Sequence, residues 1–527
     1  SGAGSVVSAN DVDITTNGQV GDAAWAYSGG RLEIDGGTYH VKGEKSPTAG
    51  ELANGLIAVG GADGVNDGVV VARNLTVITE GAESRGMRAG AAIGGVATSG
   101  RIALSGSNVT VKGADALVAE VSHGSKLQVD NSALVSQQGG GILLRNNATL
   151  TLDGTTLASA QEALRSQISQ AGQLQTITIG DGSVVTGNNG TLLLVERSGA
   201  GSDGEVHLVL QAGSESSGNI LDEGEKTGSG GTDVWLEEGA SWTGILRGIR
   251  NFFAASGGSA VFEDDAEIAG ELRAEGSGAS YTFNGKATIG NGVTGENSNN
   301  FTFNGETNIT GNVSGNNGTS FLFGSSASIT GDVSGDNGTR FRFSTDEDAG
   351  TVITGNVELR GGSSAAGGST ASPVEVSGNV DVDGNSSFGG NFAVTGTVTN
   401  SGSTGPGNSI GVHSYGSLVW GAGHVYNVEV DSSGAADHVD VAGTAQVDGS
   451  VTLTPLGGYV IGTPYTILTA GDIQGRFDDE VEFAVATPFL KATLDQQTTA
   501  VLLSIDRSDV SFASVAETRN QSATAAA

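Results

Sequence analysis

The chain has no cysteine, which excludes disulfide bonds, cysteine-ligated zinc sites and cysteine nucleophiles. Its 527 residues include only 6 prolines, too few for collagen-like or polyproline segments. Aromatic residues make up 5% of the chain, which cannot fill several thick globular cores. There is no apolar run of the roughly 18 residues that predict a membrane-spanning helix. The chain must therefore fold around small apolar side chains.

Positive charge is also scarce. The chain has 24 lysines and arginines against 58 aspartates and glutamates, which gives a formal net charge of −34. This charge opposes binding to nucleic acid, so no nucleic-acid partner is expected. The apolar fraction of 37% is nevertheless too high for a disordered acidic chain. Glycine, in contrast, accounts for 88 residues, and this combination predicts a thin core that is repeated many times.

The middle of the sequence repeats with a step of 20 residues. Three copies begin with YTFNG at Tyr281, FTFNG at Phe301 and FLFGS at Phe321. Within each copy the apolar residues alternate, which indicates short, half-buried strands. Equivalent apolar positions are Phe283, Phe303, Phe323 and Phe343, then Ile289, Ile309, Ile329 and, four residues late, Ile353.

Turns rich in glycine and asparagine separate these strands, as in ENSNN at 296–300 and GNNGT at 315–319. A unit this small cannot bury its own apolar face, but it can do so when it stacks on copies of itself. The sequence therefore predicts an all-β fold, a single-stranded right-handed parallel β-helix with coils of about 20 residues. Corresponding turn asparagines are expected to form an amide ladder along the stack: Asn297, Asn317 and Asn337.

The N-terminal half shows the same alternation with looser spacing, at steps of 25 residues from Ile102 to Leu127 and 23 from Leu127 to Leu150. One stretch, 155–175, instead has its apolar residues at helical spacing. We expect it to form a short helical insertion on one coil.

The C-terminal part carries a more specific pattern. It comprises YNVEVD at 426–431, DHVDVAGTA at 437–445, YTIL at 465–468 and GRF at 475–477. This set resembles the autochaperone region of classical, pertactin-like type V autotransporter passengers, and the resemblance is specific over 417–521.

The resemblance implies a passenger of a Gram-negative bacterium, exported through the periplasm and then displayed at the cell surface or secreted. The domains it implies are a β-helix over 1–416, an autochaperone cap over 417–510, and over 511–527 the start of a linker to a translocator β-barrel that lies outside this chain. The absence of cysteine agrees with this reading, because disulfides formed in an oxidising periplasm would fix structure before export was complete.

No residues are expected to carry catalysis. None of the 6 histidines lies in the H-E-x-x-H motif of zinc proteases. Gly407–Gly411 matches the letters G-x-S-x-G, but its flanking sequence predicts a loop without a following helix. The G-D-S-G motif of the serine-protease passengers in the resembling family is missing. Gly60–Gly68 is a single, weak likeness to a calcium-binding repeat. The sequence therefore predicts a protein that is not an enzyme and uses no cofactor or metal.

The function that we expect is that of a non-enzymatic virulence factor that binds a host extracellular or plasma protein, or the host cell surface. The resembling passengers divide between adhesins and serum-resistance factors, which can capture a complement regulator such as C1 esterase inhibitor. The alternative is a self-associating passenger for bacterial aggregation or biofilm formation. A net charge of −34 opposes that alternative at low salt, so a monomer is expected.

Two segments are candidate contact surfaces. WTGILRGIRNFF at 242–253 combines aromatic residues with arginines, the composition of binding interfaces, and 155–175 is the second. The alternative for 242–253 is a coil whose aromatic residues point inward. The candidate partner-binding residues are Trp242, Arg247, Arg250, Phe252, Phe253 and Arg165.

Overall fold

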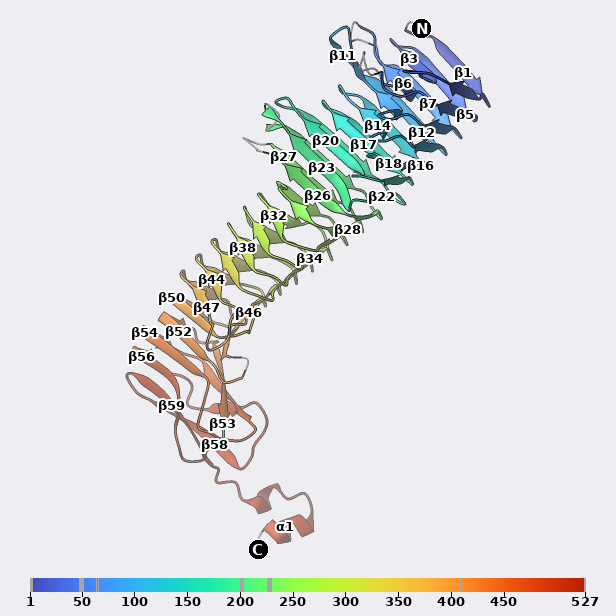
Figure 1. The fold of residues 1–527 in the computed structure, drawn as a ribbon. Helices are drawn as coiled ribbons and strands as arrows, with labels where there is room; N and C mark the ends of the chain where they lie inside the picture. Colours follow the sequence, from blue (N-terminus) through green and yellow to red (C-terminus); the bar gives the residue numbers. More distant parts are fainter. Residues whose placement is uncertain are drawn as a thin grey trace. The chain divides into compact units, whose positions relative to one another are not determined.

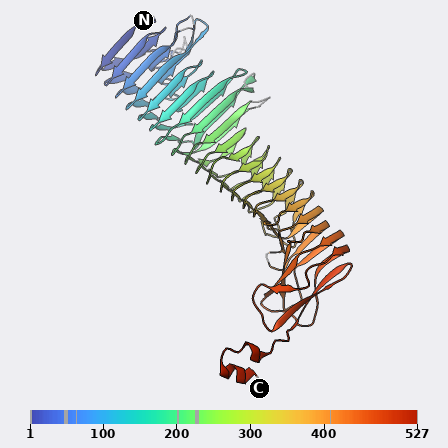
Figure 2. The same ribbon diagram turned by 180° about the vertical axis from the view of Figure 1, so that it is seen from behind.

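The computed structural model is built almost entirely of short β-strands joined by turns. It describes residues 3–46, 52–62, 64, 66–199, 203–224, 230–407 and 409–525. The chain forms two compact units, Ser1–Ile289 and Gly290–Ala527. In each unit the strands of successive coils of chain stack side by side and point the same way (Figures 1 and 2). No helix among the described residues is long and apolar enough to cross a membrane.

The first unit contains four ladders of parallel strands, called sheets A, B, C and E, and one small hairpin. Sheet A comprises β1 (Val6–Asn10), β4 (Arg31–Asp35), β7 (Gly68–Arg73), β12 (Gly100–Ser105), β15 (Lys126–Asp130), β18 (Thr149–Asp153), β21 (Leu174–Ile179), β24 (Glu205–Leu210), β27 (Gly231–Leu236), β30 (Asn251–Ala254), β32 (Ala266–Ile268), β33 (Leu272–Ala274) and β35 (Ala287–Ile289). Sheet B comprises β2 (Ile14–Thr16), β5 (Thr38–Val41), β8 (Thr76–Thr79), β13 (Asn108–Val111), β16 (Ala133–Ser136), β19 (Thr156–Ser159) and β22 (Val184–Gly187).

The third and fourth ladders complete each coil. Sheet C comprises β3 (Ala24–Tyr27), β6 (Asn54–Val59), β9 (Arg85–Ala89), β14 (Leu117–Val121), β17 (Ile142–Arg145), β20 (Leu164–Ile168), β23 (Thr191–Arg197), β26 (Asn219–Glu223) and β29 (Leu246–Arg247). Sheet E here comprises β25 (Glu215–Ser217), β28 (Ser241–Gly244), β31 (Ser259–Phe262) and β34 (Ser280–Phe283), and the hairpin is β10 (Ala91–Ile93) with β11 (Val96–Thr98).

The register of sheet A explains why the variable spacing of the N-terminal half is tolerated. Ile102 pairs with Leu127, and Leu127 pairs with Leu150, although the steps are 25 and 23 residues. All three side chains are buried. The inward positions therefore stay aligned, and the turns absorb the difference in length. This arrangement is the parallel β-helix that the sequence predicts.

The predicted helical insertion at 155–175 is wrong. This segment contains β19, β20 and the start of β21, all of which pair in parallel with the coils on either side. Leu164, Ser166 and Ile168 point inward from β20. Buried Ser166 is tolerated because its hydroxyl donates a hydrogen bond to Gln175 Oε1 at 2.7 Å. A polar residue in an inward position thus concealed the alternation of a strand.

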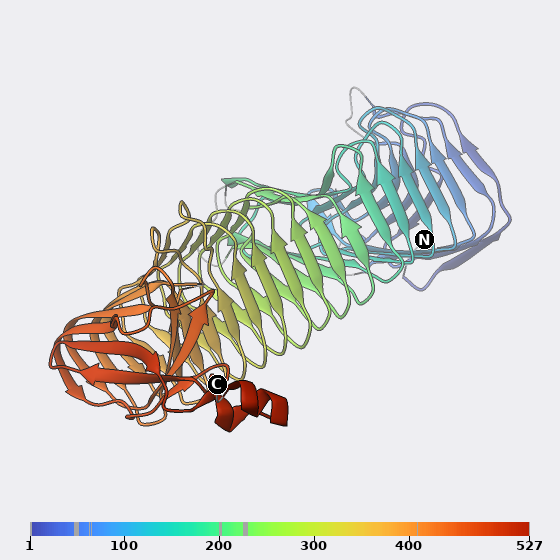
Figure 3. The same cartoon turned by 90° about the horizontal axis from the view of Figure 1, so that it is seen from below.

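The second unit contains a sheet A and a sheet E, whose coils are visible end to end in Figure 3. Its short sheet A strands are β36 (Val293–Gly295), β38 (Thr307–Ile309), β39 (Val313–Gly315), β41 (Ala327–Ile329), β42 (Val333–Gly335), β44 (Thr351–Ile353), β45 (Val357–Leu359), β47 (Val374–Val376) and β48 (Val380–Val382). Its sheet E comprises β37 (Asn300–Phe303), β40 (Ser320–Phe323), β43 (Arg340–Arg342), β46 (Ser364–Ala366), β49 (Ser387–Gly390), β51 (Ser403–Pro406), β53 (Val425–Asp431), β55 (Ser450–Leu456) and β57 (Val481–Phe483).

The 20-residue repeat produces a core of stacked phenylalanines in this unit. The rings of Phe301 and Phe321 lie 4.8 Å apart and those of Phe321 and Phe341 lie 5.0 Å apart, nearly parallel in both pairs. The four extra residues follow Phe343 and lie in a turn, as the sequence predicts, so that Ile329 still pairs with Ile353.

The short strands give way to longer ones toward the C-terminus. Both β47 and β48 pair with one strand, β50 (Phe392–Asn400), which is followed in sheet A by β52 (Val412–Trp420), β54 (His438–Val447) and β56 (Tyr465–Gly475). β52 runs without a break through the expected boundary between 416 and 417. β59 (Ala500–Arg507) pairs antiparallel with β56 and with β58 (Leu490–Gln496), which ends the parallel ladder. A 3₁₀ turn, η2 (Phe512–Val515), and a helix, α1 (Arg519–Ala525), follow in the expected linker.

Candidate binding surface

The outer face of sheet A in the first unit carries a row of aromatic side chains. In β27 the buried residues Val234 and Leu236 point inward, so Trp235 between them points outward. Trp235 pairs in register with Phe253 of β30, whose neighbour Phe252 is buried. The two outward rings stack at 5.6 Å, with an angle of 23° between their planes.

His207 of β24 extends this row by one coil. Its ring meets Trp235 edge-on at 4.8 Å. We call His207, Trp235 and Phe253 the aromatic ladder. All three side chains are only partly buried, so they remain available to a partner from outside the β-helix. Outward aromatic residues are costly to leave in water and are enriched in binding interfaces.

A cluster of charges borders the ladder at the N-terminal ends of the same strands. Arg250 donates from Nε to Asp233 Oδ1 at 2.8 Å and from Nη2 to Glu205 Oε2 at 3.0 Å. The hydrogen bonds to Asp233 and then to Glu205 raise the pKa of Arg250. The bond from Arg250 in turn lowers the pKa of Glu205. The cluster is therefore a set of fixed charges that orients the side chains beside the ladder.

This cluster also has the donor atoms of a metal site. The ligand atoms of Glu205, His207 and Asp233 lie within 4.8 Å of one another. Histidine and carboxylates are suitable ligands for zinc and related ions. However, Arg250 already places a positive charge between the two carboxylates. A metal ion would have to displace this guanidinium, so the geometry favours an ion-pair cluster.

A hollow of about 360 Å³ lies at the other end of the ladder and includes Trp235 and Phe253 in its wall. Its shape follows from Ala255, which lies one coil beyond Glu237 and one coil before Glu275. Backbone hydrogen bonds from Ala255 to Leu236 and from Glu275 to Ala254 fix that order. The small side chain of Ala255 leaves a gap between two exposed carboxylates, next to the aromatic pair.

Two of the predicted contact residues belong to the core instead. Trp242 and Phe252 are 1% and 0% exposed, and their rings pack together at 5.9 Å. The Trp242 indole donates to the carbonyl of Gly218 at 3.0 Å, which satisfies its one polar group inside the β-helix. The prediction that these two side chains contact a partner is therefore wrong. Alternation along the strands sends them inward.

The other predicted residues reach the surface on different sheets. Phe253 and Arg250 lie on sheet A, as described above. Arg247 belongs to sheet C, is largely exposed and lies 4.0 Å from Asp264. Arg165 also belongs to sheet C and pairs with Glu162 at 2.6 Å. The structure thus brings together Arg250 and Phe253 only. Sequence reasoning missed His207 and Trp235, which an alignment of inward and outward positions across coils would have shown.

The remaining motifs add no catalytic grouping among the described residues. Ser409 lies exposed in a turn that leads directly into β52, while Asn408 of the same motif lies outside the described residues. In the stretch that weakly resembles a calcium-binding repeat, Asp63 and Val65 lie outside the described residues. Asp67 forms an ion pair with Arg101 at 3.0 Å.

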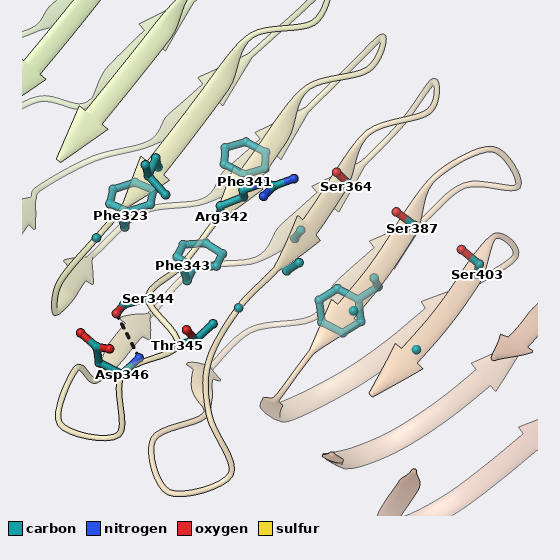
Figure 4. A pocket seen from close by; sticks show the side chains of 18 of the residues that line it. Phe323, Phe341, Arg342, Phe343, Ser344, Thr345, Asp346, Ser364, Ser387 and Ser403 are labelled. Carbon is teal, nitrogen blue, oxygen red and sulfur yellow. Dashed lines mark hydrogen bonds between the residues drawn. The ribbon is translucent and has the colours of Figure 1, made fainter. Parts of the chain in front are cut away.

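The second unit has a different kind of hollow, about 730 Å³ in volume, on the outer face of sheet E. Figure 4 shows Ser364, Ser387 and Ser403 in line along it, with Arg342 at one end and Asp346 on a rim loop. Short side chains at successive outward positions leave this face shallow. It presents no aromatic stack at its surface comparable with the ladder of the first unit, because the phenylalanines here point inward.

Comparison with known proteins was carried out on the whole chain. No protein-family model matches it. Over 139 residues, 24% of this chain and 13% of the relative, it is 35% identical to an extracellular serine protease of Serratia marcescens. Over 306 residues, 51% of this chain and 30% of the relative, it is 24% identical to the BrkA autotransporter of Bordetella pertussis. The chain is homologous to autotransporter passengers.

A solved structure, that of the Haemophilus influenzae Hap adhesin, aligns with 94% of this chain and 64% of its own, at 14% identity and a TM-score of 0.30. The passenger resemblance seen in the sequence is confirmed by the two curated relatives. This chain spans less than a third of the length of either one, since the matched parts are 13% and 30% of them.

The expectation that the protein is not an enzyme is contradicted by the relative named as a serine protease. That expectation rested on motifs absent from these 527 residues. The similarity to the protease covers 13% of the relative, so the motifs of one segment do not decide the activity of a whole passenger.

Proposed function

We propose that this chain is the β-helical part of an autotransporter passenger that is displayed on the bacterial surface or secreted, and that its aromatic ladder binds a host extracellular protein. The observation that carries the proposal is the outward stack of Trp235 and Phe253 beside a hollow. Inside the β-helix such rings would add to the core, but outward they gain most from burial against a partner.

The charges next to the ladder support a protein partner. Arg250 and its two carboxylates form a ready-made set of donors and acceptors at one end of the ladder. Glu237 and Glu275 form an acidic notch at the other end. An apolar centre with a polar rim is the usual anatomy of a protein–protein interface. The strongly negative chain would also steer a basic partner toward it.

The partner that we propose is a host plasma protein, such as a complement regulator, or a protein of the host cell surface. The former would make the passenger a serum-resistance factor, and the latter an adhesin. We also propose that the passenger acts as a monomer and does not bind nucleic acid. Export would depend on its own translocator barrel.

The test is a pull-down from human plasma and a binding assay on epithelial cells with the purified chain. The double variant Trp235→Ala/Phe253→Ala should lose about tenfold or more in affinity for the captured protein, the loss typical of a truncated binding hot spot. The control is Leu174→Ala, because Leu174 is 43% exposed on the same sheet and lies outside the ladder. Capture that is unchanged in the double variant would overturn the proposed surface. Empty assays together with salt-dependent aggregation would favour self-association instead.

A second candidate function is proteolysis by the whole passenger. The observation that favours it is the 35% identity to an extracellular serine protease. In that case the β-helix described here would present or position a catalytic part. Hydrolysis of casein by the full-length passenger, abolished by a serine-directed covalent inhibitor, would support this candidate, and undetectable hydrolysis would reject it.

A further inference from the structure

The outer face of sheet C in the first unit concentrates arginines in an otherwise acidic chain. Arg88 of β9 pairs in register with Glu120 of β14, and Glu120 pairs with Leu143 of β17. Arg85 lies on the same strand as Arg88, and Arg145 on the same strand as Leu143. Three guanidinium groups therefore surround one carboxylate.

Glu120 balances only part of this charge. Its side chain is 8% exposed and lies 3.1 Å from Arg85 Nε and 3.5 Å from Arg145 Nη1. Burial alone would raise the pKa of Glu120, but the charges of Arg85, Arg88 and Arg145 together lower it. The carboxylate is thus ionised and already saturated by its closest partner, Arg85, whose side chain is 12% exposed.

Arg88 is left with no partner of its own. It forms no ion pair among the described residues, and its Nε is buried without a hydrogen-bond acceptor. Arg145 is 41% exposed and holds Glu120 only loosely. The excess charge is felt nearby: burial and then Arg88 lower the pKa of His123. A buried guanidinium that lacks an anion is costly, so this cluster is suited to receive one.

Neutral polar groups adjoin the cluster. Arg145 lines a hollow of about 470 Å³ whose wall includes Asn146, Gln167 and Ser198. Gln167 accepts from Arg145 Nε at 2.6 Å and donates to Glu196 at 2.7 Å. Amides, a hydroxyl and a carboxylate acceptor are groups that bind the hydroxyls of a sugar.

We propose that Arg88 and Arg145 form a binding site for a sugar unit that carries a single carboxylate or sulfate group. The planar guanidinium matches the geometry of both anions. The adjacent polar hollow takes the neutral hydroxyls of the ring. A long polyanion is disfavoured, because the rest of the chain, with a net charge of −34, repels its remaining charges. This site lies on a different sheet from the aromatic ladder and does not depend on the proposed function.

The test is a titration of the protein with glucuronic acid, glucose 6-sulfate, glucose and inorganic sulfate, followed by isothermal calorimetry or ligand-detected NMR. Both acidic sugars should bind, and binding should weaken as sodium chloride is raised. Arg88→Gln and Arg145→Gln should each weaken binding about tenfold, the loss expected for a charge-assisted contact. Arg101→Gln is the control, since it removes the same charge from an exposed position on sheet A.

Three results would overturn the proposal. The first is the absence of binding by either acidic sugar. The second is an affinity that Arg88→Gln and Arg145→Gln leave unchanged while thermal melting shows that both variants are folded. The third is equal binding of glucose and glucuronic acid, which would remove the role of the anion. Inorganic sulfate that binds as tightly as the sugars would overturn the role of the hollow.

Discussion

The first and second units use the same stacking of coils but differ in what their outer faces carry. In residues 301–359 the coils repeat at 20 or 24 residues, their phenylalanines stack inside, and their turns are short. In the first unit the coil length varies, and the outer faces carry the aromatic ladder and the arginine cluster. Inward positions must align from coil to coil, whereas outward positions and turns need not. Binding surfaces are therefore expected where the repeat is least regular.

The largest expected effect concerns the regular core. Phe321→Ala should lower the free energy of unfolding of the second unit by about 3–5 kcal/mol, because Phe321 is fully buried between two stacked rings. Hydrogen exchange followed by mass spectrometry reports each unit separately and should show the loss in neighbouring coils. The matched control is Leu322→Ala on the same strand, which is 40% exposed and should change stability by less than about 0.5 kcal/mol. Equal effects of the two variants would contradict the assignment of inward and outward faces.

A second comparison sets a buried ion pair in the first unit against an exposed one in the second. Arg197 and Asp222 are 1% and 0% exposed and lie 2.8 Å apart. Arg197→Met should cost about 3–5 kcal/mol, because it leaves a buried carboxylate without its countercharge. Arg360 and Asp381 are 36% and 52% exposed, so Arg360→Met should cost at most about 1 kcal/mol. Urea denaturation monitored by hydrogen exchange measures both, and similar costs would show that burial does not set these energies.

Acid should weaken the C-terminal part of the second unit. Burial lowers the pKa of His413 and of His424 to about 3 in the folded state, below the usual 6.5. Each histidine therefore loses about 1.4 kcal/mol of stability per pH unit as the pH falls from 6.5 toward 3. Burial raises the pKa of Asp437 to about 7, from 3.8, so this carboxyl gains the same amount per unit as the pH falls through that range. The net loss between about pH 6.5 and 4 is about 1.4 kcal/mol per unit.

Denaturation at a series of pH values tests this balance. Asp437→Asn removes the opposing contribution, so the loss should steepen to about 2.7 kcal/mol per pH unit. A stability that stays constant between pH 6.5 and 4 would mean that the two histidines are not held neutral by burial.

The smallest effect concerns the turns of the regular coils. Asn317 has a φ of 49° and donates from Nδ2 to Asn297 Oδ1 at 2.8 Å. Asn317→Ala should cost about 1 kcal/mol, since alanine is strained in this conformation and the amide bond is lost. Asn317→Gly keeps the backbone conformation and should cost less. If glycine costs as much as alanine, the amide ladder and not the backbone would account for the loss.

The sequence was sufficient for the inner rows of the β-helix. The 20-residue step predicts which phenylalanines stack, and the position of the four extra residues predicts the longer turn after Phe343. It also predicts the amide contact between Asn317 and Asn297, although Asn337 donates to Asn316 and not to Asn317. Spacing predicts such features well because identical side chains occupy equivalent places.

The outer rows were harder to predict. Segment 242–253 was treated as one surface, although alternation sends Trp242 and Phe252 inward and Phe253 outward. Trp235 was missed because its partner lies 18 residues away, at a step that only the register of β27 and β30 defines. Arg88 and Arg145 were missed for the same reason, since two coil spacings separate them. Contacts between coils of unequal length depend on turn lengths that spacing alone does not fix.

The central claim is that the irregular first unit binds the partner while the regular coils of the second unit support the fold. The most direct test is hydrogen exchange of the chain with and without the host protein captured from plasma or from cells. The account predicts slower exchange, on binding, in β24, β27 and β30 around the aromatic ladder, and unchanged exchange in residues 301–359. Protection confined to residues 301–359, with β27 and β30 unaffected, would contradict it.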